Sequence, residues 1–163
     1  MIIDNVIRYI EDTNIPTLTP QFNVLVKVRY AGICRTDIGV ANGTINHPDN
    51  IILGHEFCGT IEEFYNGENE LGYWRKGMAV SCNPMMFGEK HFDTMCGKDC
   101  NGAFAEYIAV PSSALIGIPD NLLSPFGAYL EPVAAALAPE RFLRNFSDKD
   151  ICVFGDNRIA ELT

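Results

Sequence analysis

The sequence predicts a mainly β fold with a few short helices, and three observations support this class. Residues 22–30 alternate between apolar and polar side chains, as a half-buried strand does. Turn signals separate further short apolar runs, and these signals are Asn42-Gly43, Asn66-Gly67 and Lys76-Gly77. The first clear helix pattern comes late, at 130–138. Short strands at this spacing are typical of a barrel or a sandwich.

The other elements follow in order along the chain. Pro16 and Pro20 mark the loop that precedes the strand at 22–30. A polar loop is expected at 82–102, and further short strands are expected at 1–10, 57–63, 78–81 and 103–110. The helix at 130–138 carries Pro132 in its first turn, where a missing N–H is tolerated. Residues 141–146 are expected to continue it after an interruption at Pro139.

The C-terminal residues carry a different signal. Residues 150–155 are predicted to form a buried parallel strand that ends at Gly155. The next residues, 155–160, resemble a dinucleotide-binding turn in which Asn157 replaces the middle glycine and Ala160 the last. Such a fingerprint is weak without the βαβ unit that should surround it.

Composition and charge exclude several classes of function. A length of 163 residues fits one average domain, and a net charge of −9 without a basic run argues against nucleic acid as a partner. The apolar stretch 133–138 is far too short to cross a bilayer, so we expect no membrane span. The N-terminus shows no signal peptide. The six cysteines are therefore better explained as cytoplasmic thiols or metal ligands than as disulfides.

Four residues have side chains of the kind that bind zinc. These are Cys34, the adjacent pair His55-Glu56, and Glu131 much later in the chain. A catalytic zinc uses three protein ligands and keeps one position open, where it can act as a Lewis acid on a substrate oxygen. The alternative explanation is that Cys34 is a small buried hydrophobe and that His55-Glu56 forms an ordinary turn.

Five segments resemble the medium-chain, zinc-dependent alcohol dehydrogenase family, in particular its polyol and threonine dehydrogenase-like members. In chain order they are Gly32–Asp37, Gly54–Gly59, Lys76–Val80, Gly102–Tyr107 and Leu130–Ala136. The resemblance implies that residues 1–146 form a GroES-like catalytic domain, a partly open β-barrel. It also implies that residues 147–163 begin a Rossmann cofactor-binding domain that is truncated after its first strand.

The resemblance assigns a metal centre to these segments. Cys34 and His55 would be zinc ligands, and Glu131 matches the position where polyol-type members use a glutamate. Glu56 would be a neighbouring carboxylate that can approach the metal. Asp37 would accept a hydrogen bond from the far nitrogen of His55 and so fix its tautomer.

Two further roles concern substrate and cofactor. Thr36 would hydrogen-bond the substrate hydroxyl and begin a proton relay, and Arg35 would face the cofactor pyrophosphate, near the turn at Gly155. Each residue also has a simpler explanation. Thr36 and Asp37 are good capping residues for a helix that starts after Cys34, and Arg35 is equally well explained as a solvated surface charge.

Many family members hold a second, structural zinc in a lobe with four closely spaced cysteines. Cys96 and Cys100 are spaced one residue wider than the usual pair, and Cys82 lies well upstream. We therefore expect one catalytic zinc and no structural zinc. The alternative is a rearranged site built from Cys82, His91, Cys96 and Cys100.

The implied activity is hydride transfer between a small alcohol or polyol and a nicotinamide cofactor. NAD or NADP would bind only to a full-length form, so the chain alone is expected to be inactive. Expected partners are a second copy of the chain or a separate cofactor-domain chain. One alternative is a non-catalytic zinc-binding or scaffold module that docks a partner through the vacant cleft. Another is a vestigial site in which Cys34, His55 and Glu131 do not converge.

Overall fold

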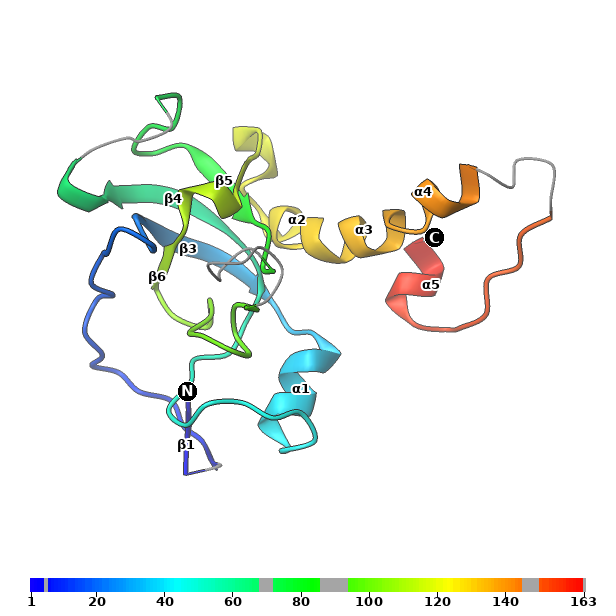
Figure 1. The fold of residues 1–163 in the computed structure, drawn as a ribbon, viewed down its shortest axis with the longest axis horizontal. Coiled ribbons are helices and arrows are strands. Elements are labelled where there is room, and N and C mark those ends of the chain that lie inside the picture. The colour runs from blue at the N-terminus through cyan, green and yellow to red at the C-terminus, as the bar shows by residue number, and fades with distance from the viewer. Residues whose placement is uncertain (5, 68–71, 86–93, 145–149, 163) are drawn as a thin grey trace.

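The fold is organised around one antiparallel sheet (Figure 1). The computed structural model describes residues 1–4, 6–67, 72–85, 94–144 and 150–162. The five strands lie in the order β6-β3-β4-β5-β7. Their bounds are Val24–Gly32 for β3, Glu56–Phe64 for β4, Ala79–Cys82 for β5, Tyr107–Val110 for β6 and Leu115–Gly117 for β7. In the described part of the chain β6 and β7 are the unjoined edges, so the sheet stays open.

The long pair β3–β4 is the centre of the sheet. Its register runs from Val24 opposite Phe64 to Gly32 opposite Glu56, with irregularities between Leu25/Val26 and Val28/Tyr30. Such irregularities increase the local twist of a strand pair. Because Gly32 lies opposite Glu56, the residues just beyond the end of β3 come to lie beside those at the start of β4.

The main core cluster combines residues of this sheet with residues of the segments that connect its strands. Its buried members are Val24, Val26, Phe57, Ile61, Trp74, Val80, Cys82, Cys96, Ala103, Ile108, Val110, Ala114 and Leu115. The alternation predicted at 22–30 is seen only in part: Val24 and Val26 lie in this cluster, but Leu25 between them is buried as well. Tyr30 is exposed where β3 runs past the core.

Two of the predicted strands are shorter than expected. Residues 1–10 form two short strands, β1 (Ile2–Ile3) and β2 (Val6–Ile7), because the chain turns at Asp4, whose φ is 50°. The strand expected at 103–110 begins only at Tyr107, because the N–H groups of Ala103 and Phe104 donate to the carbonyls of Gly54 and Leu53. These two residues therefore pack against a loop and not along the sheet.

Short helices connect and flank the sheet. The α-helices are α1 (Arg35–Ala41), α2 (Pro125–Ala128), α3 (Leu130–Leu137), α4 (Glu140–Leu143) and α5 (Arg158–Leu162). Three 3₁₀ turns, η1 (Tyr65–Gly67), η2 (Ser112–Ala114) and η3 (Asp120–Leu122), complete the elements. The helix predicted at 130–138 is thus confirmed as α3. None of the helices in the described ranges is long and apolar enough to cross a membrane.

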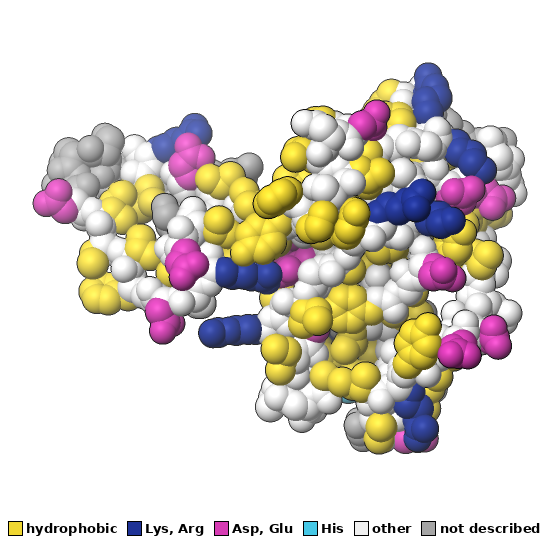
Figure 2. Space-filling model, turned by 180° about the vertical axis from the view of Figure 1, so that it is seen from behind, with side chains coloured by type: hydrophobic (Ala, Val, Ile, Leu, Met, Phe, Trp, Pro, Cys, Tyr) yellow, Lys and Arg dark blue, Asp and Glu magenta, His cyan; other side chains and the backbone are white. Residues whose placement is uncertain are grey.

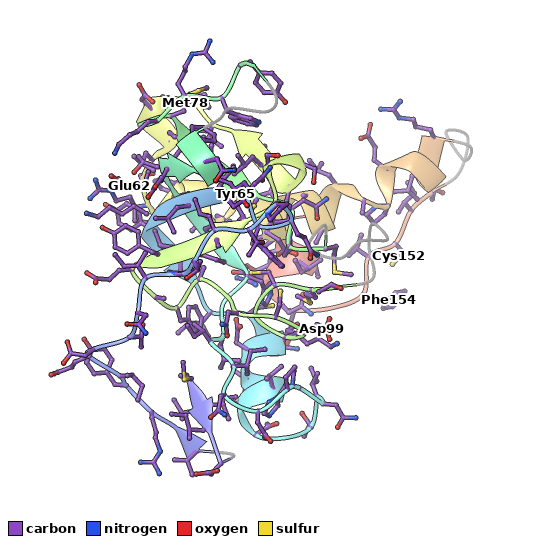
Figure 3. All side chains as sticks on the ribbon, turned by 60° about the vertical axis from the view of Figure 1, so that its left-hand side comes forward. Glu62, Tyr65, Met78, Asp99, Cys152 and Phe154 are labelled. Atoms are coloured by element: carbon purple, nitrogen blue, oxygen red, sulfur yellow. The ribbon has the colours of Figure 1, made fainter. Side chains whose placement is uncertain are left out.

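The C-terminal part forms a smaller lobe beside the sheet (Figure 2). Helices α2, α3 and α4 lead away from the sheet, and the chain then returns so that α5 packs beside α3 (Figure 1). The buried strand predicted at 150–155 is wrong: these residues pair with no strand, and Phe154 is 91% exposed. Cys152 and Phe154 lie on this returning segment, away from the sheet (Figure 3). A buried parallel strand needs neighbouring strands, and the described residues supply none there.

The central position of Phe57 leads to the first prediction. Its side chain is 1% exposed within the core cluster, so Phe57→Ala should lower the free energy of unfolding by about 3–5 kcal/mol. Phe126→Ala is the matched control, because Phe126 is 77% exposed and its loss should change stability by less than about 0.5 kcal/mol. Urea unfolding of the two variants checks this, and equal losses would contradict the assignment of the core.

Candidate metal centre

One carboxylate joins the two segments that form the centre. Asp37 is 3% exposed in the first turn of α1, and its Oδ2 accepts the N–H of Cys34 at 2.8 Å. Its Oδ1 accepts the N–H of Gly54 at 3.0 Å and lies 3.3 Å from Nδ1 of His55. Asp37 therefore caps the helix and also faces the histidine, and its role in supporting a metal-bound His55 stays a prediction.

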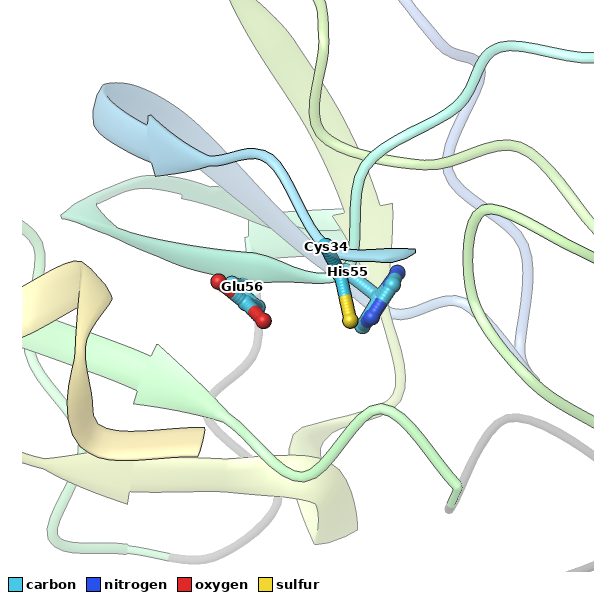
Figure 4. A group of neighbouring side chains, drawn as sticks. All are labelled: Cys34, His55 and Glu56. Atoms are coloured by element: carbon cyan, nitrogen blue, oxygen red, sulfur yellow. The ribbon is translucent and has the colours of Figure 1, made fainter. Parts of the chain in front are cut away.

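Three side chains converge beside this carboxylate (Figure 4). One donor atom each from Cys34, His55 and Glu56 lie within 4.8 Å of one another. Cys34 is half-buried at the N-terminus of α1, whereas His55 is 2% exposed and Glu56 is fully buried at the start of β4. The convergence of Cys34 and His55 follows directly from the register that brings the end of β3 beside the start of β4.

The histidine is held with a defined orientation. Its Nδ1 is buried and has no partner in full hydrogen-bond geometry, although it faces Asp37 at ion-pair distance. Burial alone would lower the pKa of His55, but the Asp37 carboxylate and the Cys34 sulfur outweigh it and raise the pKa to about 9. The nitrogen on the other side of the ring, Nε2, is left to bind a ligand.

The donors present fit a zinc ion. A thiol, an imidazole and a carboxylate are all zinc ligands, and a catalytic zinc takes three of them. A buried imidazole nitrogen that faces a carboxylate is the usual support for a metal-binding histidine, because it fixes the tautomer and the ring plane. A bound metal would replace the proton that His55 otherwise holds because its pKa is raised to about 9.

The other predicted ligand, Glu131, lies at the margin of the centre. It is half-buried on α3, and burial raises its pKa, while the charges of His55 and Glu56 also act on it. Glu131 lies outside the group of three converging donors. Its role as a zinc ligand remains a prediction.

The remaining predicted site residues differ in their placement. Thr36 is half-buried, and its Oγ1 lies 3.8 Å from the Cys34 sulfur, which donates to it. Arg35 is exposed on the first turn of α1. Gly155 has a φ of 147°, a backbone conformation that favours glycine, and it precedes the turn that leads into α5.

The sequence reasoning missed Arg158. Its Nη1 donates to Oε2 of Glu56 at 2.9 Å, and its Nη2 pairs with the other oxygen of the same carboxylate. The guanidinium also lies over the ring of Tyr129, 5.6 Å from the centroid. The only signal in the sequence was the presence of an arginine in the turn at 155–160, which we expected to contact a dinucleotide. Its partner Glu56 lies 102 residues earlier, so no local pattern connects the two residues.

The cysteines of the loop 82–102 are packed inward. Cys82 and Cys96 are buried in the core, and burial raises the pKa of both thiols, so they behave as structural groups. The Cys96 sulfur donates to the carbonyl of Gly54 at 3.5 Å, directly before His55. His91, which the rearranged zinc site would require, lies outside the described residues, so that alternative stays a prediction.

The raised pKa of His55 leads to a prediction for the metal-free protein. The imidazolium–Asp37 pair stabilises the fold fully below the ordinary pKa of 6.5, and this stabilisation is lost as the pH rises through about 9. With EDTA present, the free energy of unfolding should fall by on the order of 2 kcal/mol between about pH 6 and 8.5. Urea titrations of the wild type and Asp37→Asn test this. A variant with the same pH dependence as the wild type would contradict it.

Comparison with known proteins places the chain in a family. Residues 20–120 match the alcohol dehydrogenase GroES-like domain. Galactitol 1-phosphate 5-dehydrogenase of Escherichia coli K12 is 30% identical over 173 residues, covering 98% of this chain and 48% of that protein. An L-threonine 3-dehydrogenase of Xanthomonas oryzae pv. oryzae is 33% identical over 146 residues, covering 78% of this chain and 41% of that protein.

A solved structure agrees with the sequence match. The crystal structure of galactitol-1-phosphate dehydrogenase from E. coli superposes with a TM-score of 0.77 at 26% identity, covering 93% of this chain and 46% of that one. The GroES-like fold expected from the motifs is thereby confirmed, with an open sheet. The chain spans about half the length of the relatives it matches. It belongs to the alcohol dehydrogenase GroES-like family, among the medium-chain zinc-dependent dehydrogenases that its motifs resemble.

Proposed function

We propose that the chain is the catalytic part of a zinc-dependent dehydrogenase that transfers a hydride between an alcohol or polyol and NAD or NADP. The observation that carries this proposal is the convergence of Cys34, His55 and Glu56 donors within 4.8 Å, at the family's motif positions. Bound zinc would act as a Lewis acid that stabilises the substrate oxygen as it loses its proton. Glu131 is our candidate for a further ligand, because the charges of His55 and Glu56 act on its carboxyl group.

The chain's own residues orient this chemistry. Asp37 holds the imidazole of His55 from behind and anchors the backbone of Cys34, so the two ligands keep a fixed separation. Thr36 places its hydroxyl beside Cys34, where its Oγ1 could accept a hydrogen bond from a substrate hydroxyl.

The hydride acceptor would need residues beyond those of this chain. We propose that residues 1–146 are the catalytic domain and that 147–163 begin a nicotinamide cofactor domain, with Arg35 and the turn at Gly155 facing the cofactor. The chain spans 48% of its E. coli relative, which supports this division. Full activity would then need a cofactor domain in the same chain or on a separate one.

The substrate and the setting can be proposed in the same way. The curated relatives are named for galactitol 1-phosphate and L-threonine, so we propose a small hydroxylated molecule as substrate. We propose a cytoplasmic location, which is supported by the six cysteines being free. A homo-oligomer is our proposal for the assembled enzyme.

Zinc content tests the function most directly. The purified wild-type chain should contain one zinc per chain, and Cys34→Ser should lose most of it, because a hydroxyl is a much poorer zinc ligand than a thiolate. Elemental analysis of dialysed protein measures this. Cys152→Ser is the matched control, since Cys152 is an exposed cysteine away from the centre and its loss should leave the zinc in place.

Activity then separates the enzyme from a scaffold. Joined to a nicotinamide-binding domain of a relative, the chain should oxidise at least one member of an alcohol and polyol panel in a zinc-dependent reaction. Bound zinc and cofactor without any turnover would favour the non-catalytic module. Absence of zinc from the wild type would favour a vestigial site.

A further inference from the structure

We propose that the outer edge of strand β6 is a binding site for an extended peptide segment, which adds to the sheet as a further strand in the cavity between β6 and the N-terminal chain. The inference goes beyond the proposed zinc chemistry. Among the described residues that line this cavity, none is a metal-centre donor, that is, Cys34, His55 or Glu56.

Two adjoining hollows separate β6 from the N-terminal chain at residues 9–17, which runs past the outer side of the sheet (Figure 1). Their volumes are about 330 and 380 Å³, a size that holds small ligands. Both hollows are lined by Pro16 on one side and by Tyr107 of β6 on the other. The first hollow is mostly apolar, with Phe22 and Ile52 among its lining residues, so it suits an apolar side chain.

The strand edge that faces the cavity carries backbone groups without partners. Just before β6, the carbonyl of Glu106 accepts the N–H of Val28 at 2.9 Å. Residues alternate in an antiparallel pair, so Tyr107 and Ala109 direct their N–H and C=O groups away from β3. Within the described residues these outward groups form no hydrogen bond, although both residues line the first hollow. Such an edge is a template for another strand.

The N-terminal chain leaves this edge unpaired. Residues 9–17 form neither helix nor strand, and in the described part of the protein none of them makes a backbone hydrogen bond to β6. Pro16 also has no N–H to donate. The cavity therefore leaves room for a ligand chain beside the strand.

The spacing of the unpaired groups identifies the ligand as polypeptide. Tyr107 and Ala109 are two residues apart, so their N–H and C=O groups recur at about 6.8 Å along the strand. An extended peptide offers acceptors and donors with the same repeat, and peptides add to free sheet edges in this way.

The two hollows and the charge of the chain define the peptide further. One apolar side chain would enter the first hollow. The second hollow is the polar end of the site, because Arg8, Glu11 and Glu106 border it. The net charge of −9 attracts a peptide that carries a positive charge.

Amide hydrogen exchange of the full chain, followed by NMR, tests both the edge and its ligand. The probe is a pentapeptide of alternating valine and threonine with a lysine at one end. Without the probe, the N–H groups of Tyr107 and Ala109 should exchange faster than that of Ile108, which faces β3. Saturating probe should slow exchange at Tyr107 and Ala109 on the order of fivefold. Equal protection of all three groups before the probe is added would overturn the inference.

Two N-methylated probes test whether the peptide backbone makes the contact. N-methyl groups on every second residue remove the N–H groups along one edge of an extended peptide, and a shift by one residue removes those along the other edge. One of the two probes should bind the wild type on the order of fivefold more weakly in fluorescence polarisation, and the other as well as the unmodified probe. Equal affinities would overturn the inference.

A protein variant gives a matched test. Ala109→Pro removes the outward N–H, and proline is tolerated where the lost N–H lies outside the ladder. It should weaken binding of the unmodified probe on the order of fivefold, whereas Ala109→Ser keeps the N–H and should bind like the wild type. A folded Ala109→Pro chain that binds as the wild type does would overturn the inference, and so would a wild type that binds no probe. Zinc content measures the proposed function separately, so the two can fail independently.

Discussion

The buried carboxylate of Asp37 is the interaction on which the rest of the centre depends. It accepts backbone N–H groups from Cys34 and Gly54 and faces the imidazole of His55. Two segments that are 20 residues apart are thereby joined through one side chain. Replacing Asp37 would leave the N–H groups of Cys34 and Gly54 and the imidazole of His55 without this partner at once. The loss in the free energy of unfolding should therefore exceed that from removing a single hydrogen bond.

Two glycines, Gly97 and Gly102, pack against the backbone of Leu53 and Gly54, which directly precedes His55. A Cβ atom at Gly97 would come within 2.7 Å of the Gly54 carbonyl oxygen, and φ at Gly97 is 75°. Gly102 likewise lies against the carbonyls of Leu53 and Gly54. The loop that contains Cys96 can therefore press directly on the backbone that precedes His55. Asp37 on one side and this glycine contact on the other leave His55 little freedom to move.

Local sequence patterns predicted the centre because its residues are close in the chain or are set by one strand register. Cys34 and Asp37 share the first turn of α1, and His55 directly precedes Glu56, the first residue of the strand that pairs with the one before Cys34. The position of Arg158 could not be predicted in this way, because its contact depends on how a distant segment returns to the sheet.

The strands show the same division between local and long-range information. The strand predicted at 57–63 lies within β4, and the one predicted at 78–81 overlaps β5 from Ala79 onward, because apolar patterning is a local property. The edge strand β7 has three residues, too few for a pattern to be recognised. The segment 150–155 has the composition of a buried strand, but composition cannot supply the neighbouring strands that such a strand requires.

The hydrogen bonds of Asp37 have a consequence for how the protein acquires its metal. They join protein groups to one another, so the chain itself fixes the positions of Cys34 and His55. An ion bound there would not have to fold the segments that carry its ligands. Chains with and without zinc should therefore share the same shape and secondary structure.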